Sequence, residues 1–169
     1  MKPVVGIIMG SDSDAPIMHE AGKTLQQFGV PYEIGVYSAH RSPHRTNEYV
    51  RSARERGLKM IIAGAGSSAH LAGVTAAETI LPVIGVPIDS SPLSGFDALM
   101  ATVQMPPGVP VSTMGVGKSG AINAAILAVE ILALSDENLA QKLTDYKAKL
   151  EVTVAEKSAK VASEMGLKG

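Results

Sequence analysis

Short runs of consecutive apolar residues recur along the chain, and longer segments with helical spacing separate them. A strand that is buried on both faces needs such continuous apolar character, whereas a half-exposed strand alternates apolar and polar residues. The pattern therefore predicts a parallel sheet of five strands covered by helices on both sides, a three-layer α/β/α domain. The predicted strands cover residues 4–9, 32–38, 59–65, 82–88 and 110–116.

Residues that favour helix ends mark the boundaries of several predicted helices. Gly29 and Gly57 follow segments with helical periodicity, and glycine readily adopts the left-handed conformation that ends many helices. Ser42 precedes a proline, a combination typical of a helix start. The order Ser94-Gly-Phe-Asp97 predicts a capping box at the start of a later helix.

After five strand–helix units, the segment from residue 135 to residue 165 has the pattern of one long helix with an apolar stripe. Because five helices already suffice to cover the sheet, we expect this stripe to pack against another subunit; a helix folded back on its own domain is the alternative. The sequence thus divides into a domain of residues 1–134 and a C-terminal helical extension of residues 135–169. The stripe consists of Leu139, Leu143, Tyr146, Leu150 and Val154.

Composition limits the classes of protein to which the chain can belong. Its 169 residues suit one domain, and 46% hydrophobic with 18% charged residues is typical of a well-packed globular protein. A net charge of -1 without a cluster of basic residues predicts no binding to nucleic acid. No segment reaches the ~20 apolar residues of a membrane span. The absence of cysteine excludes disulfides and thiolate metal sites. We expect a cytoplasmic protein.

The first loop with candidate chemistry covers residues 9–14 (MGSDSD) and follows the first predicted strand. Ligands of open α/β sheets bind beyond the carboxyl ends of the strands, where this loop lies. Amides at the start of the next helix favour an anion, and an aspartate there can accept hydrogen bonds from sugar hydroxyls. The loop therefore indicates a sugar phosphate; a helix cap formed by Ser13 or Asp14 is the alternative.

Two other glycine-rich loops share features with nucleotide-binding motifs but depart from them. Residues 64–73 (GAGSSAHLAG) spell G-x-G-x-x-A, and Asp89 follows twenty residues after Ala69, as in a dinucleotide site. Such a site usually belongs to the first strand–helix unit, whereas this loop belongs to the third. Residues 112–120 (STMGVGKSG) lack the first glycine of a P-loop, so we interpret Lys118 as a helix-start residue near the same crevice.

The four histidines differ in their predicted positions. His19 and His44 fall within predicted helices and are expected on the surface, whereas His40 and His70 lie just beyond strand ends. Arg41 follows His40 directly. Histidine exchanges protons near neutral pH and arginine binds phosphate, so these residues predict a site that binds an anion and moves protons. The sequence has no ligand spacing typical of a metal site.

Six motifs in order along the chain carry a resemblance to a known family: MGSDSD, SAHR, AGAGSSAHLAG, LPVIGVP, VQMPPGVPV and GKSGAINAAILA. Over about residues 4–134, the sequence closely resembles the class I N5-carboxyaminoimidazole ribonucleotide mutases of purine biosynthesis. The resemblance implies a flavodoxin-like sheet and an octamer of identical chains with active sites at subunit contacts. It also implies a reaction that moves a carboxylate from N5 to C4 of a small-molecule ribonucleotide substrate, without a metal, nucleotide or organic cofactor.

The resemblance further implies roles for individual residues. His40 is expected to act as general acid and base, protonating the carbamate nitrogen as carbon dioxide leaves and then removing the C4 proton. Ser11, Asp14 and Arg41 are expected to hold the phosphoribosyl part. The other expected substrate-binding residues are Ser38, Gly66, Ser67 and His70.

The sequence departs from the family pattern in one loop. Where these mutases read Gly-Gly-Ala-Ala-His-Leu-Pro-Gly, residues 66–73 read Gly-Ser-Ser-Ala-His-Leu-Ala-Gly, so that Ala72 replaces a proline expected to stiffen the loop. A related carboxylase of the same fold, which uses free carbon dioxide, differs in this loop, and the retained Ala-His-Leu favours the mutase. A non-catalytic sugar-phosphate or flavin-binding module is another alternative, but it gives the paired His40 and Arg41 no function.

Overall fold

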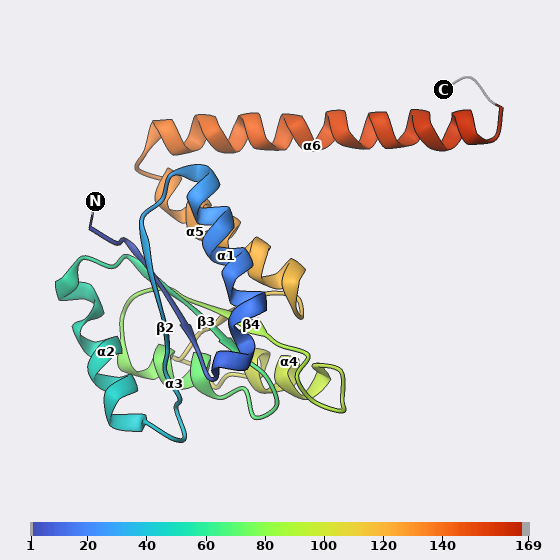
Figure 1. Cartoon of the computed structure of the whole chain (residues 1–169). Coiled ribbons are helices and arrows are strands. Elements are labelled where there is room, and N and C mark those ends of the chain that lie inside the picture. The colour runs from blue at the N-terminus through green and yellow to red at the C-terminus, as the bar shows by residue number, and fades with distance from the viewer. Residues whose placement is uncertain (1, 167–169) are drawn as a thin grey trace. The chain divides into compact units, whose positions relative to one another are not determined.

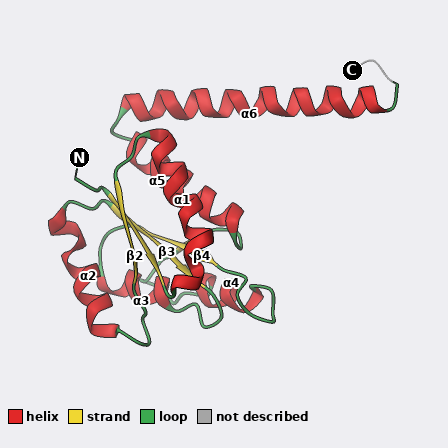
Figure 2. Cartoon of the chain, viewed as in Figure 1, coloured by secondary structure: helices red, strands yellow, loops and turns green. Residues whose placement is uncertain are grey.

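A parallel sheet forms the centre of the fold in this computed structural model, which describes residues 2–166 (Figures 1 and 2). The sheet order is β2-β1-β3-β4-β5. The strands are β1 (Val5–Met9), β2 (Tyr32–Val36), β3 (Met60–Ala65), β4 (Val83–Pro87) and β5 (Ser112–Thr113). The helices are η1 (Asp12–Asp14), α1 (Ala15–Phe28), α2 (Pro43–Arg56), α3 (Leu71–Glu78), α4 (Phe96–Val103), α5 (Lys118–Ala133) and α6 (Glu137–Glu164).

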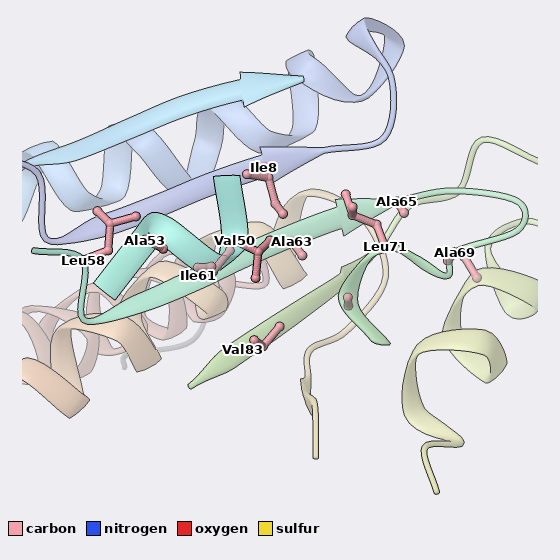
Figure 3. Packing of buried hydrophobic residues seen from close by; sticks show 12 residues of the cluster. Ile8, Val50, Ala53, Leu58, Ile61, Ala63, Ala65, Ala69, Leu71 and Val83 are labelled. Carbon is pink, nitrogen blue, oxygen red and sulfur yellow. The ribbon is translucent and has the colours of Figure 1, made fainter. Parts of the chain in front are cut away.

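Helices cover both faces of the sheet, as the sequence predicted (Figure 1). On one face, α2, α3 and α4 share a buried apolar cluster with the strands; Figure 3 shows Val50 and Ala53 of α2 beside Ile61 of β3. On the other face lie α1 and the first part of α5. There Met18 of α1 packs so closely on Gly64 of β3 that a side chain at this glycine would overlap the methionine sulfur. The arrangement confirms the three-layer, flavodoxin-like prediction.

The strand predictions hold best in the centre of the sheet. Every residue of β1, β3 and β4 is buried, as continuous apolar strands require. At one edge, β2 has a neighbour on one side only, and its Ile34 and Val36 are exposed. At the other edge, β5 has two residues instead of the seven predicted; Pro110 opens the predicted range, and proline cannot donate to the ladder.

Two helix ends follow the sequence signals directly. Gly29 ends α1 with φ 75° and Gly57 ends α2 with φ 103°, both in the left-handed region that glycine enters at little cost. Ser42 occupies the position before α2, but its hydroxyl does not cap the helix. It donates to the carbonyl oxygen of Ser38 instead, so it closes the preceding loop.

The predicted capping box of α4 is wrong. The helix begins at Phe96, one residue later than the box requires, and Gly95 with φ 82° takes the cap position. The hydroxyl of Ser91 donates to the carboxylate of Asp97 over 2.7 Å, so the acidic partner of the expected box is already engaged by an earlier serine. The loop from β4 therefore folds on itself before the helix starts.

The chain separates into two compact units, residues 1–128 and residues 129–169. Within the second unit, the Asp136 carboxylate caps α6 by accepting from the backbone N–H groups of Asn138 and Leu139. Near its start, α6 buries Leu143, whereas Leu150 is 48% exposed and Val154 66% exposed. The apolar stripe is thus covered only at its N-terminal end. Within residues 2–166, no helix is both long enough and apolar enough to cross a membrane.

One rung of the sheet offers a test of how burial is distributed. Ile34, Ile7, Ile62 and Ile84 are aligned across four neighbouring strands. We expect Ile62→Ala to lower the free energy of unfolding by about 2–5 kcal/mol, because the side chain is fully buried and its loss leaves a cavity. Ile34→Ala should cost about 1 kcal/mol or less, because 40% of that side chain is exposed. Denaturant unfolding measures both; equal costs would contradict the exposed position of β2.

Candidate active site

A polar cavity of about 380 Å³ lies beyond the carboxyl ends of β1 to β4, within residues 1–128. Its volume falls in the range of roughly 300–1,000 Å³ that small-molecule sites occupy. In a doubly wound sheet this is also the edge where ligands bind, next to the point at which the strand order reverses. The cavity is lined by Gly10, Ser11, Ser13, Asp14, Ser38, Ala39, His40, Arg41, Ala65, Gly66, Ser67, Ser68, Leu71 and Ser90.

The structure brings the site residues expected from the sequence together. Seven of them line the cavity: Ser11, Asp14, Ser38, His40, Arg41, Gly66 and Ser67. The eighth, His70, is not part of the lining but contacts His40. His19 and His44 are exposed on α1 and α2, as expected.

The loop after β1 holds its serine and aspartate in a capping box. The backbone N–H of Ser11 donates to the Asp14 carboxylate over 3.0 Å, and the Ser11 hydroxyl accepts from the N–H of Ser13. The expected cap by Ser13 or Asp14 does not form: Ser11 caps η1 instead, and Asp14, which directly precedes α1, makes no side-chain cap hydrogen bond to that helix. Asp14 is only 4% exposed, and this burial raises its pKa, although the Ser11 N–H and the charge of Arg41 oppose the rise.

The loop after β2 is a closed turn that presents His40 and Arg41. The Ser38 carbonyl accepts hydrogen bonds from Ser42 and from the buried Thr46, while its hydroxyl accepts from the backbone N–H of Arg41 over 3.1 Å. The Arg41 guanidinium donates to the carbonyl oxygen of Gly10 over 3.1 Å. Arg41 thereby joins the loops that follow β1 and β2, and it carries the one permanent positive charge among the described residues of the lining.

His40 and His70 meet across the site. The Nε2 atom of His40 lies 2.9 Å from Nδ1 of His70, and the two rings are nearly perpendicular, with centroids 5.0 Å apart. His70 directly precedes α3, and its backbone N–H donates to the Ser68 carbonyl. The contact therefore joins the loop after β2 to the loop after β3.

The loop after β3 approaches the loop after β4 closely at Gly66. A side chain at this position would overlap the hydroxyl of Ser90, and its Cβ would lie 3.2 Å from the Ile88 carbonyl oxygen, so the glycine is required sterically. Ser90 lines the cavity although it was not among the site residues predicted from the sequence. The signal for Ser90 is its position just beyond the end of the fourth strand, because the other candidate residues also follow strand ends.

The departures from the family pattern in residues 66–73 have different structural consequences. Ser67 has φ 36°, in the left-handed region that favours glycine, and it stands where the family pattern has glycine. Ala72 is the second residue of α3 and is buried. The proline that it replaces would therefore sit in the first turn of a helix, which tolerates proline, and not in the loop that we expected it to stiffen.

Two residues considered in the glycine-rich motifs lie outside the lining. Asp89, the acid of the dinucleotide-like pattern, does not line the cavity. Lys118 begins α5 as expected, but its ammonium pairs with Glu20 of α1 at 3.0 Å and it is likewise absent from the lining.

The chemistry of the lining suits an anionic ligand with several hydroxyl groups. Serine hydroxyls and backbone amides can donate hydrogen bonds, Arg41 can pair with a phosphate, and the Asp14 carboxylate can accept from a sugar. His40 adds a group that can exchange protons. Among residues 2–166, no cluster of three or more histidine and acidic side chains could hold a metal ion.

Fold and site together define a flavodoxin-like α/β protein with an acid–base group in a polar cavity above the switch point of its sheet. The sequence comparisons make this class specific. The chain belongs to the AIR carboxylase family, whose model matches residues 4–153.

Relatives and a solved structure agree with this assignment. The chain is 53% identical over 165 residues to an N5-carboxyaminoimidazole ribonucleotide mutase of Pyrococcus horikoshii, covering 98% of this chain and 92% of that protein. It is 52% identical over 161 residues to the phosphoribosylaminoimidazole carboxylase of Saccharomyces cerevisiae, covering 95% of this chain but 28% of that protein. The crystal structure of Treponema denticola PurE superposes with a TM-score of 0.84 at 27% identity, covering 94% and 98% of the two chains.

The buried carboxyl of Asp14 predicts a pH-dependent cost to stability. Because its pKa is higher in the folded than in the unfolded protein, the folded state binds the proton more tightly, and stability is lost as the pH rises through the folded pKa. Asp14→Asn, which keeps an oxygen acceptor for Ser11 N–H, should therefore raise the melting temperature relative to wild type at pH 7. Thermal unfolding should show this difference shrinking towards pH 3.5.

The exposed neighbour Asp12 provides the matched control, since Asp12→Asn removes one carboxylate from the same loop but leaves the Asp14 carboxyl buried, and burial is the largest cause of its raised pKa. A lower melting temperature for Asp14→Asn at pH 7, or a difference that does not change with pH, would contradict the burial effect.

Proposed function

We propose that the chain is an N5-carboxyaminoimidazole ribonucleotide mutase of purine biosynthesis, which moves the carboxylate from N5 to C4 of the aminoimidazole ribonucleotide. The observation that carries the proposal is the convergence of His40 with Arg41, Asp14 and several serines in one cavity. High identity to the P. horikoshii mutase over nearly the whole of both chains supports it.

The substrate offers a phosphate, a ribose and a carboxylated imidazole, and the cavity has a counterpart for each. Arg41 binds the phosphate, and the serine hydroxyl of Ser11 adds a donor to the same anion. Asp14 accepts hydrogen bonds from the ribose hydroxyls. Its carboxylate has several acceptor positions, and the Ser11 N–H occupies only one of them. Ser38, Gly66 and Ser67 surround the base, where Gly66 leaves room for its close approach.

His40 supplies both proton transfers of the reaction. As the bond between N5 and the carboxylate carbon breaks, the protonated imidazole gives its proton to N5, and carbon dioxide is released within the cavity. The C4 carbon then attacks carbon dioxide, and the neutral imidazole removes the C4 proton. The histidine ends in its starting protonation state, so one group acts first as acid and then as base. Imidazole suits both tasks because it can donate and accept protons near neutral pH.

The carboxylase alternative forms the same C4 bond from free carbon dioxide. It is favoured by identity to the S. cerevisiae carboxylase, but this chain spans only 28% of that protein. Identity over 92% of the length of a relative named as a mutase therefore outweighs it.

A steady-state assay tests the proposed reaction. The purified protein is offered either the N5-carboxylated ribonucleotide at low bicarbonate or the uncarboxylated ribonucleotide with bicarbonate, and formation of the C4-carboxylated product is measured. We expect product from the first substrate without added bicarbonate. His40→Asn should lower kcat by about 10²- to 10⁴-fold, because general acid–base catalysis is lost.

His19→Asn is the matched control, since it makes the same substitution at an exposed position of α1 outside the cavity, and it should retain the wild-type rate. Product that forms only from the uncarboxylated substrate, and rises with carbon dioxide, would establish the carboxylase instead. A His40→Asn variant as active as His19→Asn would refute the role of His40.

We propose further that the protein assembles as an octamer and that α6, with the extension of residues 135–169, packs against another subunit. The exposed apolar residues in the second half of α6 support this, because a lone helix with such a stripe gains stability by burying it. A cysteine-free chain also suits the reducing cytoplasm, which is the location that we propose.

Light scattering combined with size-exclusion chromatography tests the assembly. Wild type should elute with eight times the 17.5 kDa mass of one chain. Leu150→Glu together with Val154→Glu should shift the protein to smaller species, because each places a charge in the proposed contact. Lys149→Glu introduces the same residue at a polar position of α6 and should leave the mass unchanged. A monomeric wild type, or an octamer unaffected by the double substitution, would contradict the proposal.

A further inference from the structure

The ring of His40 is held by one polar contact. Within residues 2–166, His70 is the only protein group that hydrogen-bonds to it, through the 2.9 Å approach of His40 Nε2 to His70 Nδ1. His40 lines the cavity and His70 does not. The pair thus consists of one histidine that faces the cavity and one that contacts this histidine without lining the cavity.

Hydrogen-bond chemistry restricts which nitrogen of the pair carries the proton. A bond between two ring nitrogens needs one N–H donor and one lone pair. In the mechanism proposed above, His40 alternates between imidazolium, with protons on both nitrogens, and neutral imidazole. His70 can keep the bond in both states only if its Nδ1 atom is the acceptor, because a donating His70 would face the Nε2 proton of the imidazolium.

We propose that His70 is a positioning residue for His40: its Nδ1 accepts from the Nε2–H of His40, fixes the orientation of that ring and leaves His40 Nδ1 as the nitrogen that exchanges protons with the substrate. The inference rests on the proposed mutase function and adds a role for His70, which was expected from the sequence to bind substrate. The neutral acceptor acts as orienting carboxylates do for other catalytic histidines.

The proton balance of the reaction closes with this arrangement. His40 Nδ1–H gives its proton to N5 as the N5–carboxylate bond breaks, while Nε2–H stays bonded to His70. When the carbon dioxide carbon has bonded to C4, the C4 proton moves to the free lone pair of His40 Nδ1. His70 keeps its own proton on Nε2 throughout, and no proton passes between the two histidines.

The backbone of His70 is suited to hold a ring in place. Its N–H donates to the Ser68 carbonyl over 2.8 Å, and its carbonyl accepts from Val74 in the first turn of α3 over 2.9 Å. The neighbouring Ala69 and Leu71 are buried in the apolar cluster. The position of the His70 backbone is therefore fixed on both sides, although its ring is exposed.

Three substitutions of His70 separate positioning from other roles. Asn places an amide oxygen two bonds from Cβ, where Nδ1 of histidine lies, and so can accept from His40. Gln places the amide one bond further, near the position of Nε2, and Phe keeps the ring without an acceptor. We expect His70→Asn to stay within about threefold of the wild-type kcat, and His70→Gln and His70→Phe to lose about 10- to 100-fold in kcat with little change in KM.

The mutase assay on the N5-carboxylated substrate decides between the outcomes. Wild type that makes no product would overturn the proposed function itself. An active wild type with His70→Phe at the same rate, or with His70→Asn as impaired as His70→Gln, would overturn the positioning role alone. A raised KM with unchanged kcat in His70→Phe would also overturn it, because that result would assign His70 to substrate binding.

A second readout does not depend on activity. The chain has four histidines, so nitrogen-15 NMR of protein labelled in histidine gives few ring signals, which His40→Asn and His70→Asn identify. At a pH where the pair is neutral, we expect a proton on His40 Nε2 and none on His70 Nδ1, and loss of this preference in His70→Phe. A proton on His70 Nδ1 in the wild type would overturn the proposed direction of the bond.

Discussion

The position of β1 between β2 and β3 is the constraint on which the site depends. Crossovers between parallel strands are right-handed, so the step from β1 to β2 and the return step from β2 to β3 place α1 and α2 on opposite faces of the sheet. The loops that leave β1 and β3 therefore diverge and open a crevice at the carboxyl edge. The residues that line this opening come from the loops after four strands.

The loops around the opening are tied to one another by few but specific contacts. Arg41 joins the loop after β2 to the Gly10 carbonyl of the loop after β1, and the His40–His70 pair joins it to the loop after β3. Gly66 and Ser90 bring the loops after β3 and β4 into contact. Each of these contacts involves a residue that lines the cavity. The contacts that fix the positions of the loops therefore also fix the shape of the cavity.

The sequence was informative wherever burial acts over several consecutive residues. The fully buried strands β1, β3 and β4 and the glycine ends of α1 and α2 follow from local composition. The extent and burial of the edge strands were harder to predict from the sequence. Because β2 and β5 have one neighbouring strand each, their burial depends on what lies outside the sheet. The predicted capping box of α4 does not form, because Asp97 accepts a hydrogen bond from the hydroxyl of Ser91. The His40–His70 contact joins two loops thirty residues apart, and no local pattern encodes such a distance.

The buried Asp14 couples ligand binding to solution acidity. Burial raises the pKa of this carboxyl, so the folded protein keeps its proton to a higher pH than an exposed aspartate would. A polyhydroxylated ligand that donates hydrogen bonds to the carboxylate would favour the ionised form, and the protein would then release a fraction of a proton on binding. By linkage, affinity for such a ligand would weaken as the surroundings acidify. A ligand that binds through this one aspartate would thus be held less tightly in an acidic compartment than in a neutral one.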